Sequence, residues 1–368
     1  MNLYQIIQLK PSPADHLVAL DVEILGAVPQ KDQLVFLKGN GGDTAVTAIE
    51  SVKKSGDKQY ALELAILTDY IEIDLMEIMP GKRLLGGPSK DDFYQLSLQQ
   101  RRKWLLDVVL AYCGEAVAAY VASAVRAGVG LVTTEEGRGS HPGGTRLGGA
   151  PDLPAGIRWP QTPQGHPLAL LAQINFGELS QLPHIAALSD FPGKGLLSFF
   201  AYPFAEGDTD ILLKKGHCQV LYFPENTDLS RKNNPEDIEE VMWPDPAFCL
   251  PFDVLELPAP EIAVGENPAW SPADQRDYGY CYQICREYFT AADYRNKLLG
   301  YPDQLPGLSD KLNPLAQPGE VLLFQFDCTD PVIDMMPFLG EGVLYFFIQQ
   351  NDLQNLHFDK VRLAIEEG

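Results

Sequence analysis

The chain has 368 residues and a formal net charge of −22, with 45% hydrophobic and 21% charged residues. This is the composition of a globular protein rather than a disordered one, and the length favours two domains over one hydrophobic core. Charged residues interrupt the most apolar stretch, Leu105–Val132, so no membrane span is predicted. Residues Met1–Pro11 lack a signal-peptide pattern, and six cysteines in so long a chain do not indicate a disulfide framework, which favours a cytoplasmic protein.

Most of the acid excess lies in the second part of the chain. Residues 1–130 contain 13 Lys and Arg against 16 Asp and Glu, whereas residues 131–368 contain 15 against 34. An acidic surface repels the phosphates of nucleic acids and anionic membranes, and it attracts basic proteins. The same excess can also serve solubility alone. We therefore expect a basic protein partner, no nucleic acid and no membrane, with the oligomeric state left open.

Residues 1–85 are predicted to form a small β-barrel-like domain. The segment contains six short runs of hydrophobic residues with mixed alternation, separated by turn residues. Six strands at this spacing are typical of a small barrel. The runs are Tyr4–Leu9, Leu17–Leu25, Leu34–Leu37, Thr44–Val52, Tyr60–Ile66 and Ile71–Ile78.

Residues 86–130 are predicted to form a helical connector. Ser97 followed by Gln100 is the capping-box pattern that starts a helix, and hydrophobic residues then recur at helical spacing until Gly128. Such a stripe usually packs into a core rather than forming a binding groove. Its members are Trp104, Leu105, Val108, Val109, Tyr112, Ala116, Ala119 and Tyr120. Residues 131–147 are then predicted to be a linker.

Residues 148–368 carry the most specific pattern in the chain. It starts with Gly-Gly-Ala-Pro-Asp-Leu-Pro from Gly148 and continues in separated blocks to the end. The blocks are Gly148–Pro160 with Pro167–Leu168 and Leu171–Asn175, then Gly195–Phe200, Lys297–Pro302, and Leu322–Asp327 with Gly342–Ile348. In this order they resemble the YwqG-like family. Where many members carry Trp-Gly-Asp before the last strand, this chain has Phe338–Glu341, which leaves the role of that acid open.

The resemblance implies protein binding. YwqG-like domains occur in bacteria near toxin and immunity genes. Their fold is similar to the C-terminal region of programmed-cell-death protein 2, and this protein and its yeast relative look like chaperones for a small-subunit ribosomal protein. An acidic domain that holds a basic client agrees with the charge of residues 131–368. The expected function is therefore a chaperone-like or toxin-immunity-like interaction module.

The same region contains an internal repeat. Leu170–Ile174 and Leu322–Phe326 are apolar runs with a central glutamine, and each is followed by Gly-x-Leu-x-Phe-Phe, from Gly195 and from Gly342. The sequence thus predicts an α+β protein whose β-rich C-terminal domain, residues 148–368, is built on a strand–loop–strand duplication. A buried glutamine needs partners for its carbonyl and amide groups, so the two glutamines either fix neighbouring backbone or face a ligand.

Six residues are the candidate binding residues of this domain. Trp159 lies between Pro154 and Pro160, which hold the chain extended, so its indole either plugs the core or offers an aromatic surface to a partner. The other five come from the repeated strands. The candidates are Trp159, Gln173, Asn175, Gln325, Asp327 and Tyr345.

The alternative is an enzyme with a polar pocket between the two repeats. The sequence contains neither a phosphate-binding loop nor a nucleophile elbow, so no catalytic residue is predicted. Cys281 and Cys285 have helical spacing, but the nearest other pair, His217–Cys218, is poorly spaced for structural zinc. No metal and no cofactor are therefore predicted.

Overall fold

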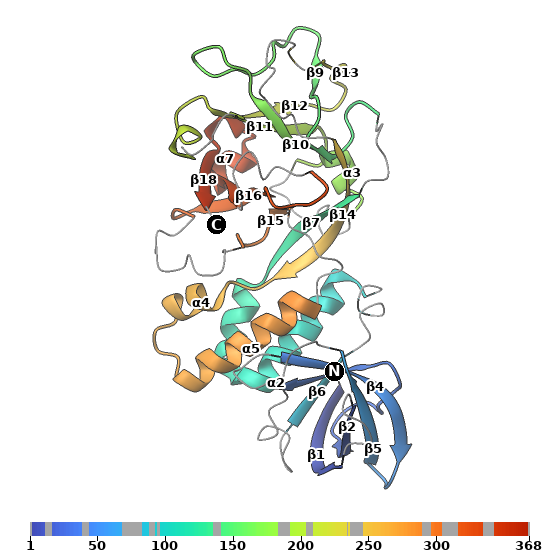
Figure 1. Cartoon of the computed structure of the whole chain (residues 1–368). Helices are drawn as coiled ribbons and strands as arrows, with labels where there is room; N and C mark the ends of the chain where they lie inside the picture. The colour runs from blue at the N-terminus through green and yellow to red at the C-terminus, as the bar shows by residue number, and fades with distance from the viewer. Residues whose placement is uncertain are drawn as a thin grey trace. The chain divides into compact units, whose positions relative to one another are not determined.

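The structure of the protein is a computed structural model that describes fourteen parts of the chain. They are residues 2–11, 17–38, 44–67, 83–87, 93, 96–134, 141–182, 192–203, 209–233, 235, 246–288, 296–303, 316–333 and 342–366. The chain divides into two compact units, Met1–Val125 with Leu255–Ala291 and Arg126–Val254 with Ala292–Gly368. Figure 1 shows the elements of both units. Among the helices within the described parts, none combines the length and apolarity of a transmembrane segment.

The first unit contains a closed β-barrel. Its strands are β1 (Asn2–Lys10), β2 (Leu17–Ile24), β3 (Leu34–Lys38), β4 (Thr44–Lys54), β5 (Gln59–Ile66) and β6 (Arg83–Gly87). They follow the order β1-β2-β5-β4-β3-β6 around the barrel. Alternate residues of β5, such as Tyr60, Leu62 and Leu64, are buried in the interior, as period-2 alternation requires.

Five of the six predicted barrel strands are confirmed. The sixth, Ile71–Ile78, lies outside the described residues. The barrel closes instead with β6, which pairs with both β1 and β3. This short Arg-Leu-Leu-Gly-Gly strand lacks a clear alternation, which explains why the sequence pattern did not identify it.

Three helices complete the first unit: α2 (Leu98–Ala124), α4 (Pro260–Glu266) and α5 (Pro272–Tyr288). The predicted capping box is present at the start of α2. The backbone N–H of Gln100 donates to Ser97 Oγ at 3.3 Å, and the backbone N–H of Ser97 donates to Gln100 Oε1 at 2.9 Å. Helix α2 contacts α5, so part of its apolar surface packs inside this unit.

The chain becomes a strand earlier than the helical pattern indicated. Residues Arg126–Thr134 form β7, so the helix ends before Gly128, and the predicted linker, residues 131–147, contains the end of β7 and also β8 (Arg146–Leu147). Valine and threonine favour a strand here. Gly130 does not stop a helix but leaves room for a ring: a Cβ there would lie 2.5 Å from Cζ of Phe252. The predicted division into domains stays a prediction.

The second unit is built on a ten-stranded sheet in the order β12-β11-β10-β8-β14-β7-β15-β16-β17-β18. Beyond β7 and β8, its strands are β10 (Ala169–Asn175), β11 (Leu196–Ala201), β12 (Cys218–Phe223), β14 (Ala247–Glu256), β15 (Asn296–Leu299), β16 (Glu320–Asp327), β17 (Val343–Gln349) and β18 (Arg362–Glu366). Two further strands, β9 (Asp152–Pro154) and β13 (Leu229–Arg231), pair with each other. The short helices are α3 (Phe176–Leu179), α7 (Gln350–Gln354), η1 (Thr209–Ile211) and η2 (Phe358–Lys360).

The sheet contains the same strand arrangement twice, which confirms the predicted duplication and the α+β class. β10, β11 and β12 are consecutive antiparallel neighbours, and so are β16, β17 and β18. In both repeats a β-bulge falls two residues before the glutamine, at Leu171 and at Leu323. Because a bulge sets the register of the strand beyond it, this shared position places Gln173 and Gln325 on the same face of the sheet in their repeats.

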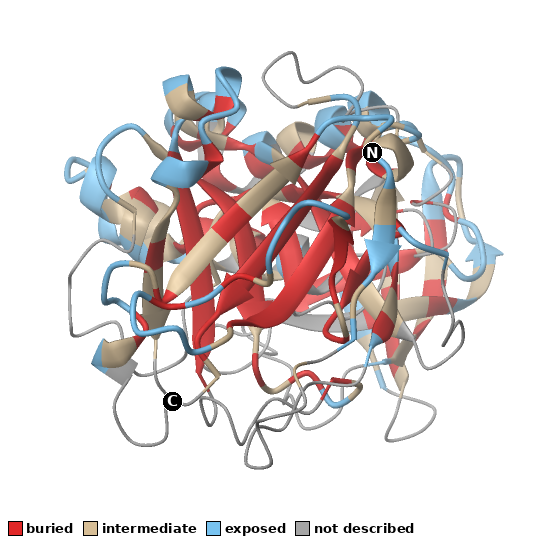
Figure 2. Ribbon diagram, turned by 90° about the horizontal axis from the view of Figure 1, so that it is seen from above, coloured by how far each residue is buried: buried red, intermediate tan, exposed pale blue. Residues whose placement is uncertain are grey.

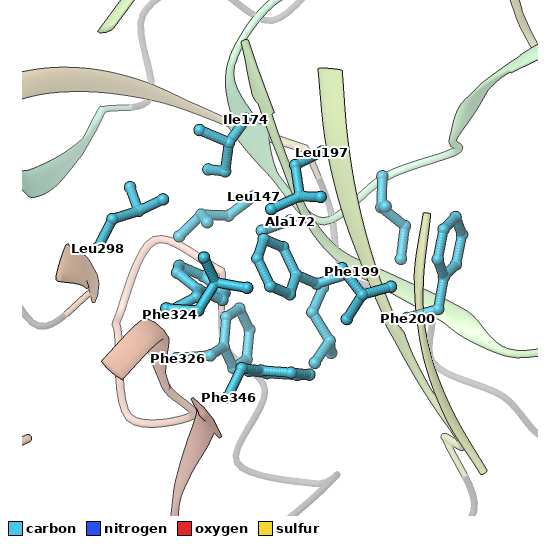
Figure 3. Close-up of a cluster of buried hydrophobic side chains, with 14 of the residues drawn as sticks. Leu147, Ala172, Ile174, Leu197, Phe199, Phe200, Leu298, Phe324, Phe326 and Phe346 are labelled. Atoms are coloured by element: carbon cyan, nitrogen blue, oxygen red, sulfur yellow. The ribbon is translucent and has the colours of Figure 1, made fainter. Parts of the chain in front are cut away.

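Phenylalanines from both repeats form the centre of one core. The ring centroid of Phe199 lies 4.6 Å from that of Phe324 and 5.0 Å from that of Phe346, and all three side chains are fully buried. Figure 3 shows these rings pointing toward one another from strands of different repeats. In Figure 2 the strands that carry the core are largely red, which marks them as buried. The two repeats therefore depend on each other for burial of their apolar surfaces.

Replacing the central ring tests this dependence. Phe199→Ala is expected to lower the free energy of unfolding by about 3–5 kcal/mol, because it removes buried area and leaves a cavity between the repeats. The matched control is Leu213→Ala, at a residue that is 53% exposed, with an expected change within about 0.5 kcal/mol. Urea denaturation of both variants measures the difference, and equal losses would contradict a shared core.

Candidate functional site

The two predicted glutamines lie inside the second unit, and both use their polar groups internally. Gln173 on β10 is fully buried. Its Nε2 donates to the carbonyl of Gly144 at 2.9 Å and to Asp152 Oδ2 at 2.7 Å, while its Oε1 accepts from the backbone N–H of Asp152 at 3.2 Å. Both amide hydrogens and the carbonyl are thus satisfied. The side chain thus joins β10 to Gly144, which precedes β8, and to Asp152, which begins β9.

Asp152 is the centre of a buried group of charges, here named the first cluster: Arg146, Asp152, Gln173 and Arg231. Arg146 Nη1 lies 2.7 Å from Asp152 Oδ2, and Arg231 Nε lies 3.1 Å from Oδ1. The side chains of Arg146 and Asp152 are 2% and 0% exposed, and that of Arg231 is 36% exposed. The backbone N–H of Gly143 also donates to Asp152, at 2.9 Å. A buried carboxylate is tolerated when it is paired and hydrogen-bonded to this extent.

These contacts keep Asp152 ionised. Burial acts to raise its pKa, but the hydrogen bonds from Arg146 and from the Gly143 N–H, together with the charge of Arg146 and a hydrogen bond from Arg231, lower the pKa to about 2. Burial also lowers the pKa of Arg146, and Asp152 opposes that effect. The first cluster is therefore an ion pair at neutral pH and not a proton donor or acceptor.

The second repeat contains the matching group, here named the second cluster: Lys297, Asp303 and Gln325. Lys297 Nζ lies 3.0 Å from Asp303 Oδ1. Gln325 donates from Nε2 to Asp303 Oδ2 at 2.9 Å and accepts at Oε1 from the backbone N–H of Asp303 at 2.9 Å. The contacts of Gln173 with Asp152 are thus repeated. Asp303 differs from Asp152 in exposure, because its side chain is 32% exposed.

The charged residues of both clusters were missed by the sequence reasoning, although a signal for them exists. In each repeat a cation precedes the aspartate by six residues, in Arg-Leu-Gly-Gly-Ala-Pro-Asp from Arg146 and Lys-Leu-Leu-Gly-Tyr-Pro-Asp from Lys297. The turn geometry matches as well, since Gly148 and Leu299 have φ of 63° and 61°. Comparing these two blocks with each other would have identified the cation and its aspartate.

Asn175 and Asp327 have equivalent positions at the ends of β10 and β16. Asn175 Oδ1 accepts from the backbone N–H of Gly177 at 2.8 Å, which caps α3, and Asp327 Oδ1 accepts from the backbone N–H of Thr329 at 2.8 Å. Each side chain therefore fixes the turn that leaves its strand. The difference between them is charge, since the first is neutral and the second is a carboxylate.

Tyr345 lies opposite Gln325 on the neighbouring strand and joins the second cluster. Its hydroxyl donates to the carbonyl of Asp303 and to Glu366 Oε2, the latter at 2.7 Å. Burial first, and then the charges of Glu366, Asp303 and Asp327, raise the pKa of Tyr345 far above its ordinary value. Three carboxylates thus act on one buried hydroxyl.

Trp159 is placed differently from the other five candidates. Its indole Nε1 donates to the backbone carbonyl of Leu168 at 2.9 Å, and the side chain is half-buried. This contact fixes the loop between β9 and β10. The structure brings Gln325 and Tyr345 together, and Gln173 and Asn175 share β10. The binding roles of all six residues stay predictions.

A family model described as a domain of unknown function, DUF1963, matches residues 145–366. The chain belongs to this family. The match begins one residue before Arg146 and ends at Glu366, so the DUF1963 region contains both clusters and both repeats. A comparison with curated proteins gives no match.

Three cysteines of the DUF1963 domain have raised thiol pKa values. Burial raises the pKa of the Cys218 thiol to about 12, and it also raises those of Cys249 and Cys328, so these thiols stay protonated at neutral pH. Within the described ranges, no group of three or more His, Cys, Asp or Glu side chains has the arrangement of a metal site. The arrangement can hold fixed charges and present the partly exposed ones.

Removing each buried cation tests the difference between the two clusters. Arg146→Met is expected to lower the free energy of unfolding by about 3–5 kcal/mol, because Asp152 stays inaccessible to water. Lys297→Met is expected to lower the free energy of unfolding by at least ~1 kcal/mol less than Arg146→Met does, because water can hydrate the partly exposed Asp303. Urea denaturation of the matched pair measures both. A larger loss for Lys297→Met would contradict the assigned exposures.

The pKa of Asp152 predicts a pH dependence of stability. Its folded pKa of about 2 lies below the value of an unfolded aspartate, so its contribution is present above about pH 4 and is lost as pH falls toward 2. Asp152→Asn lacks this contribution. The difference in free energy of unfolding between the wild type and the variant is expected to be constant from pH 7 to 5 and to narrow by ~2 kcal/mol in acid. A difference that does not change with pH would contradict the ion pair.

Proposed function

We propose that the DUF1963 domain of this cytoplasmic protein is a non-catalytic interaction module that binds a basic protein partner. The observation that carries the proposal is the acidic surrounding of Tyr345, which contains Asp303, Asp327 and Glu366. Asp303 and Glu366 are both partly exposed. A lysine or arginine side chain of a partner is the group that such a place attracts.

The contrast between the repeats supports this assignment. In the first cluster two arginines contact one aspartate, and Arg231 extends from inside the domain to its surface. In the second cluster Lys297 contacts Asp303, and the equivalent of Asn175 is the carboxylate Asp327. The second repeat therefore has the more negative cluster. The excess of 34 acidic over 15 basic residues in 131–368 extends this field over the domain.

Two features favour binding over catalysis. The amide groups of Gln173 and Gln325 are occupied by Asp152 and Asp303, so the glutamines are held in place and are not aimed at a substrate. The raised pKa of Tyr345 keeps its hydroxyl protonated at neutral pH, which removes it as a general base. The cluster is rigid and charged, which suits recognition.

The resemblance to the YwqG-like family indicates biological roles for the proposed binding. The DUF1963 match covers the same region as the YwqG-like blocks, Gly148–Pro160 through Gly342–Ile348. We assign the domain to the YwqG-like group on that basis. The chaperone-like and immunity-like roles that the resemblance implies both agree with the binding of a basic protein.

Binding of a basic peptide tests the proposal. The full chain is expected to bind a fluorescent peptide rich in lysine and arginine, with an affinity that falls as salt is raised, because exposed charges are screened. A glutamate-rich peptide of equal length should not bind. Glu366→Gln keeps a hydrogen-bond acceptor for Tyr345 but removes one charge, and it is expected to weaken binding about two- to fivefold. Fluorescence anisotropy measures each affinity.

The matched control is Glu50→Gln in the barrel. Glu50 is 54% exposed and pairs loosely with Lys31, at 3.8 Å, so its loss tests the effect of total charge. Its affinity for the basic peptide is expected to equal that of the wild type. Absence of binding at low salt would refute the proposal. Equal weakening by Glu50→Gln and Glu366→Gln would refute the acidic surrounding of Tyr345 as the binding site. Attraction by the total charge of the protein would then explain the binding.

A further inference from the structure

A pair of cysteines lies in the first unit. Cys113 is outside residues 145–366, which match DUF1963, and Cys281 is within them. Cys113 on α2 and Cys281 on α5 have Sγ atoms 3.4 Å apart, although 168 positions separate them in the sequence. Both carry reduced thiols, and their exposed fractions are 7% and 0%. The S–S bond of a disulfide is about 2.05 Å long, so the two sulfur atoms need to approach by about 1.3 Å. Small side-chain and helix adjustments cover such a distance.

Buried residues lie one turn from each cysteine on its helix. Val109 and Val117 lie one turn before and one turn after Cys113 on α2, and both are fully buried. On α5, Tyr278 lies three residues before Cys281 and is also fully buried. The thiols therefore lie within the packed contact between α2 and α5 rather than at its fraying end.

Aromatic contacts fix the same helix pair next to the thiols. The ring centroids of Tyr120 and Trp270 are 5.2 Å apart, and those of Trp270 and Tyr278 are 5.3 Å apart. The hydroxyl of Tyr278 donates to the carbonyl of Pro258 at 2.7 Å, and that of Tyr120 donates to Glu266 Oε2 at 2.7 Å. The rings of Tyr120 and Trp270 pack edge to face, and those of Trp270 and Tyr278 are tilted, so the helices keep their spacing without a covalent link.

We propose that Cys113 and Cys281 form a redox-modification site. A peroxide oxidises the pair to an intramolecular disulfide, which joins α2 covalently to α5, and a dithiol reductant restores the thiols. The site takes hydrogen peroxide as oxidant and needs no further group from the protein.

The reaction balances in two steps. The thiolate of Cys113, the more exposed of the pair, attacks one oxygen of hydrogen peroxide, forming an S–O bond and breaking the O–O bond, and one water leaves after proton transfer. The Cys281 sulfur then attacks the sulfenic sulfur, forming the S–S bond and releasing a second water. Two thiols and one peroxide give one disulfide and two waters, so the pair loses two electrons and the peroxide gains them.

The topology gives this bond a consequence. Helix α5 belongs to the segment Leu255–Ala291, which joins Met1–Val125 in one compact unit although residues 126–254 separate the two in the chain. In the reduced protein, non-covalent contacts hold this segment on α2. A disulfide across a loop this long reduces the freedom of the unfolded chain more than one across a short loop. Oxidation therefore stabilises the first unit against detachment of α5.

The other cysteines provide a comparison. Cys218, Cys249 and Cys328 lie in the second unit, and among the cysteines whose side chains are described, Cys113 and Cys281 are the ones with sulfur atoms in contact. The side chain of Cys285, four residues after Cys281 on α5, lies outside the described residues. Any test must therefore separate Cys281 from Cys285.

Peroxide treatment of the full chain tests the proposal. After treatment, the remaining thiols are blocked and the protein is digested with trypsin without reductant. The digest should contain the peptide of Cys113 joined to the peptide that contains Cys281 and Cys285. Its mass should be two hydrogen atoms below the sum of the two separate peptides, with the third cysteine blocked. The link should disappear with dithiothreitol. The midpoint of thermal unfolding is expected to rise on oxidation, on the order of 5 °C, and to return on reduction.

Three serine variants identify the sulfur atoms. Cys113→Ser and Cys281→Ser should abolish the link and the thermal shift, whereas Cys285→Ser, the matched control on the same helix, should keep both. Because the wild-type measurement needs no variant, a variant that fails to fold does not remove the test. Absence of the linked peptide in the treated wild type, or its loss in Cys285→Ser with retention in Cys281→Ser, would overturn the proposal.

Discussion

The second unit depends on one arrangement of buried charge: a cation, an aspartate six residues later, and a glutamine on the next strand that holds the aspartate by its backbone and its carboxylate. A buried charge is costly when it is alone. Arg146 can therefore lie at the centre of the sheet when the following loop folds back and brings Asp152 to it. Gln173 fixes this position of the loop, because its amide group hydrogen-bonds both to the backbone N–H and to the carboxylate of Asp152.

The same constraint explains how two repeats with the same backbone can differ in chemistry. The turn, the bulge and the glutamine contacts fix the geometry, so the surrounding residues are free to vary in charge. In the first repeat Arg231 contacts the shared aspartate from β13. In the second, Tyr345 connects Asp303 with Glu366. One duplicated framework thus supports a sealed ion pair on one side and a partly exposed acidic group on the other.

Much of the fold was accessible from the sequence because it depends on local patterns. Residue types a few positions apart predict the capping box at Ser97, five barrel strands and the glutamine-centred repeat. The order of ten strands in one sheet was not, since pairing between distant segments leaves no local pattern. β6 and β7 were missed because glycines interrupt their alternation.

The candidate site was predicted in part for the same reason. Gln173 and Gln325 stand out as amides within apolar runs, but their partners Asp152 and Asp303 each follow a proline in a short segment that looks like an ordinary turn in the sequence. The role of the Asp303 charge becomes clear from the contacts of this residue with Lys297 and Tyr345, which lie on two different strands. The spacing of residues in the sequence does not predict contacts between side chains that meet only after folding.

Under the proposed function, a rigid acidic group has consequences for the kind of partner that it would recognise. Because internal hydrogen bonds already hold Asp303 and Tyr345 in place, binding of a cation would order few additional side chains in the domain, which lowers the entropic cost of association. Partly exposed charges act mainly on the rate of encounter and on the choice of partner, and less on final affinity. A tight complex would then need apolar contacts supplied by the partner's own shape. The acidic group would select basic proteins, and the surface around it would choose among them.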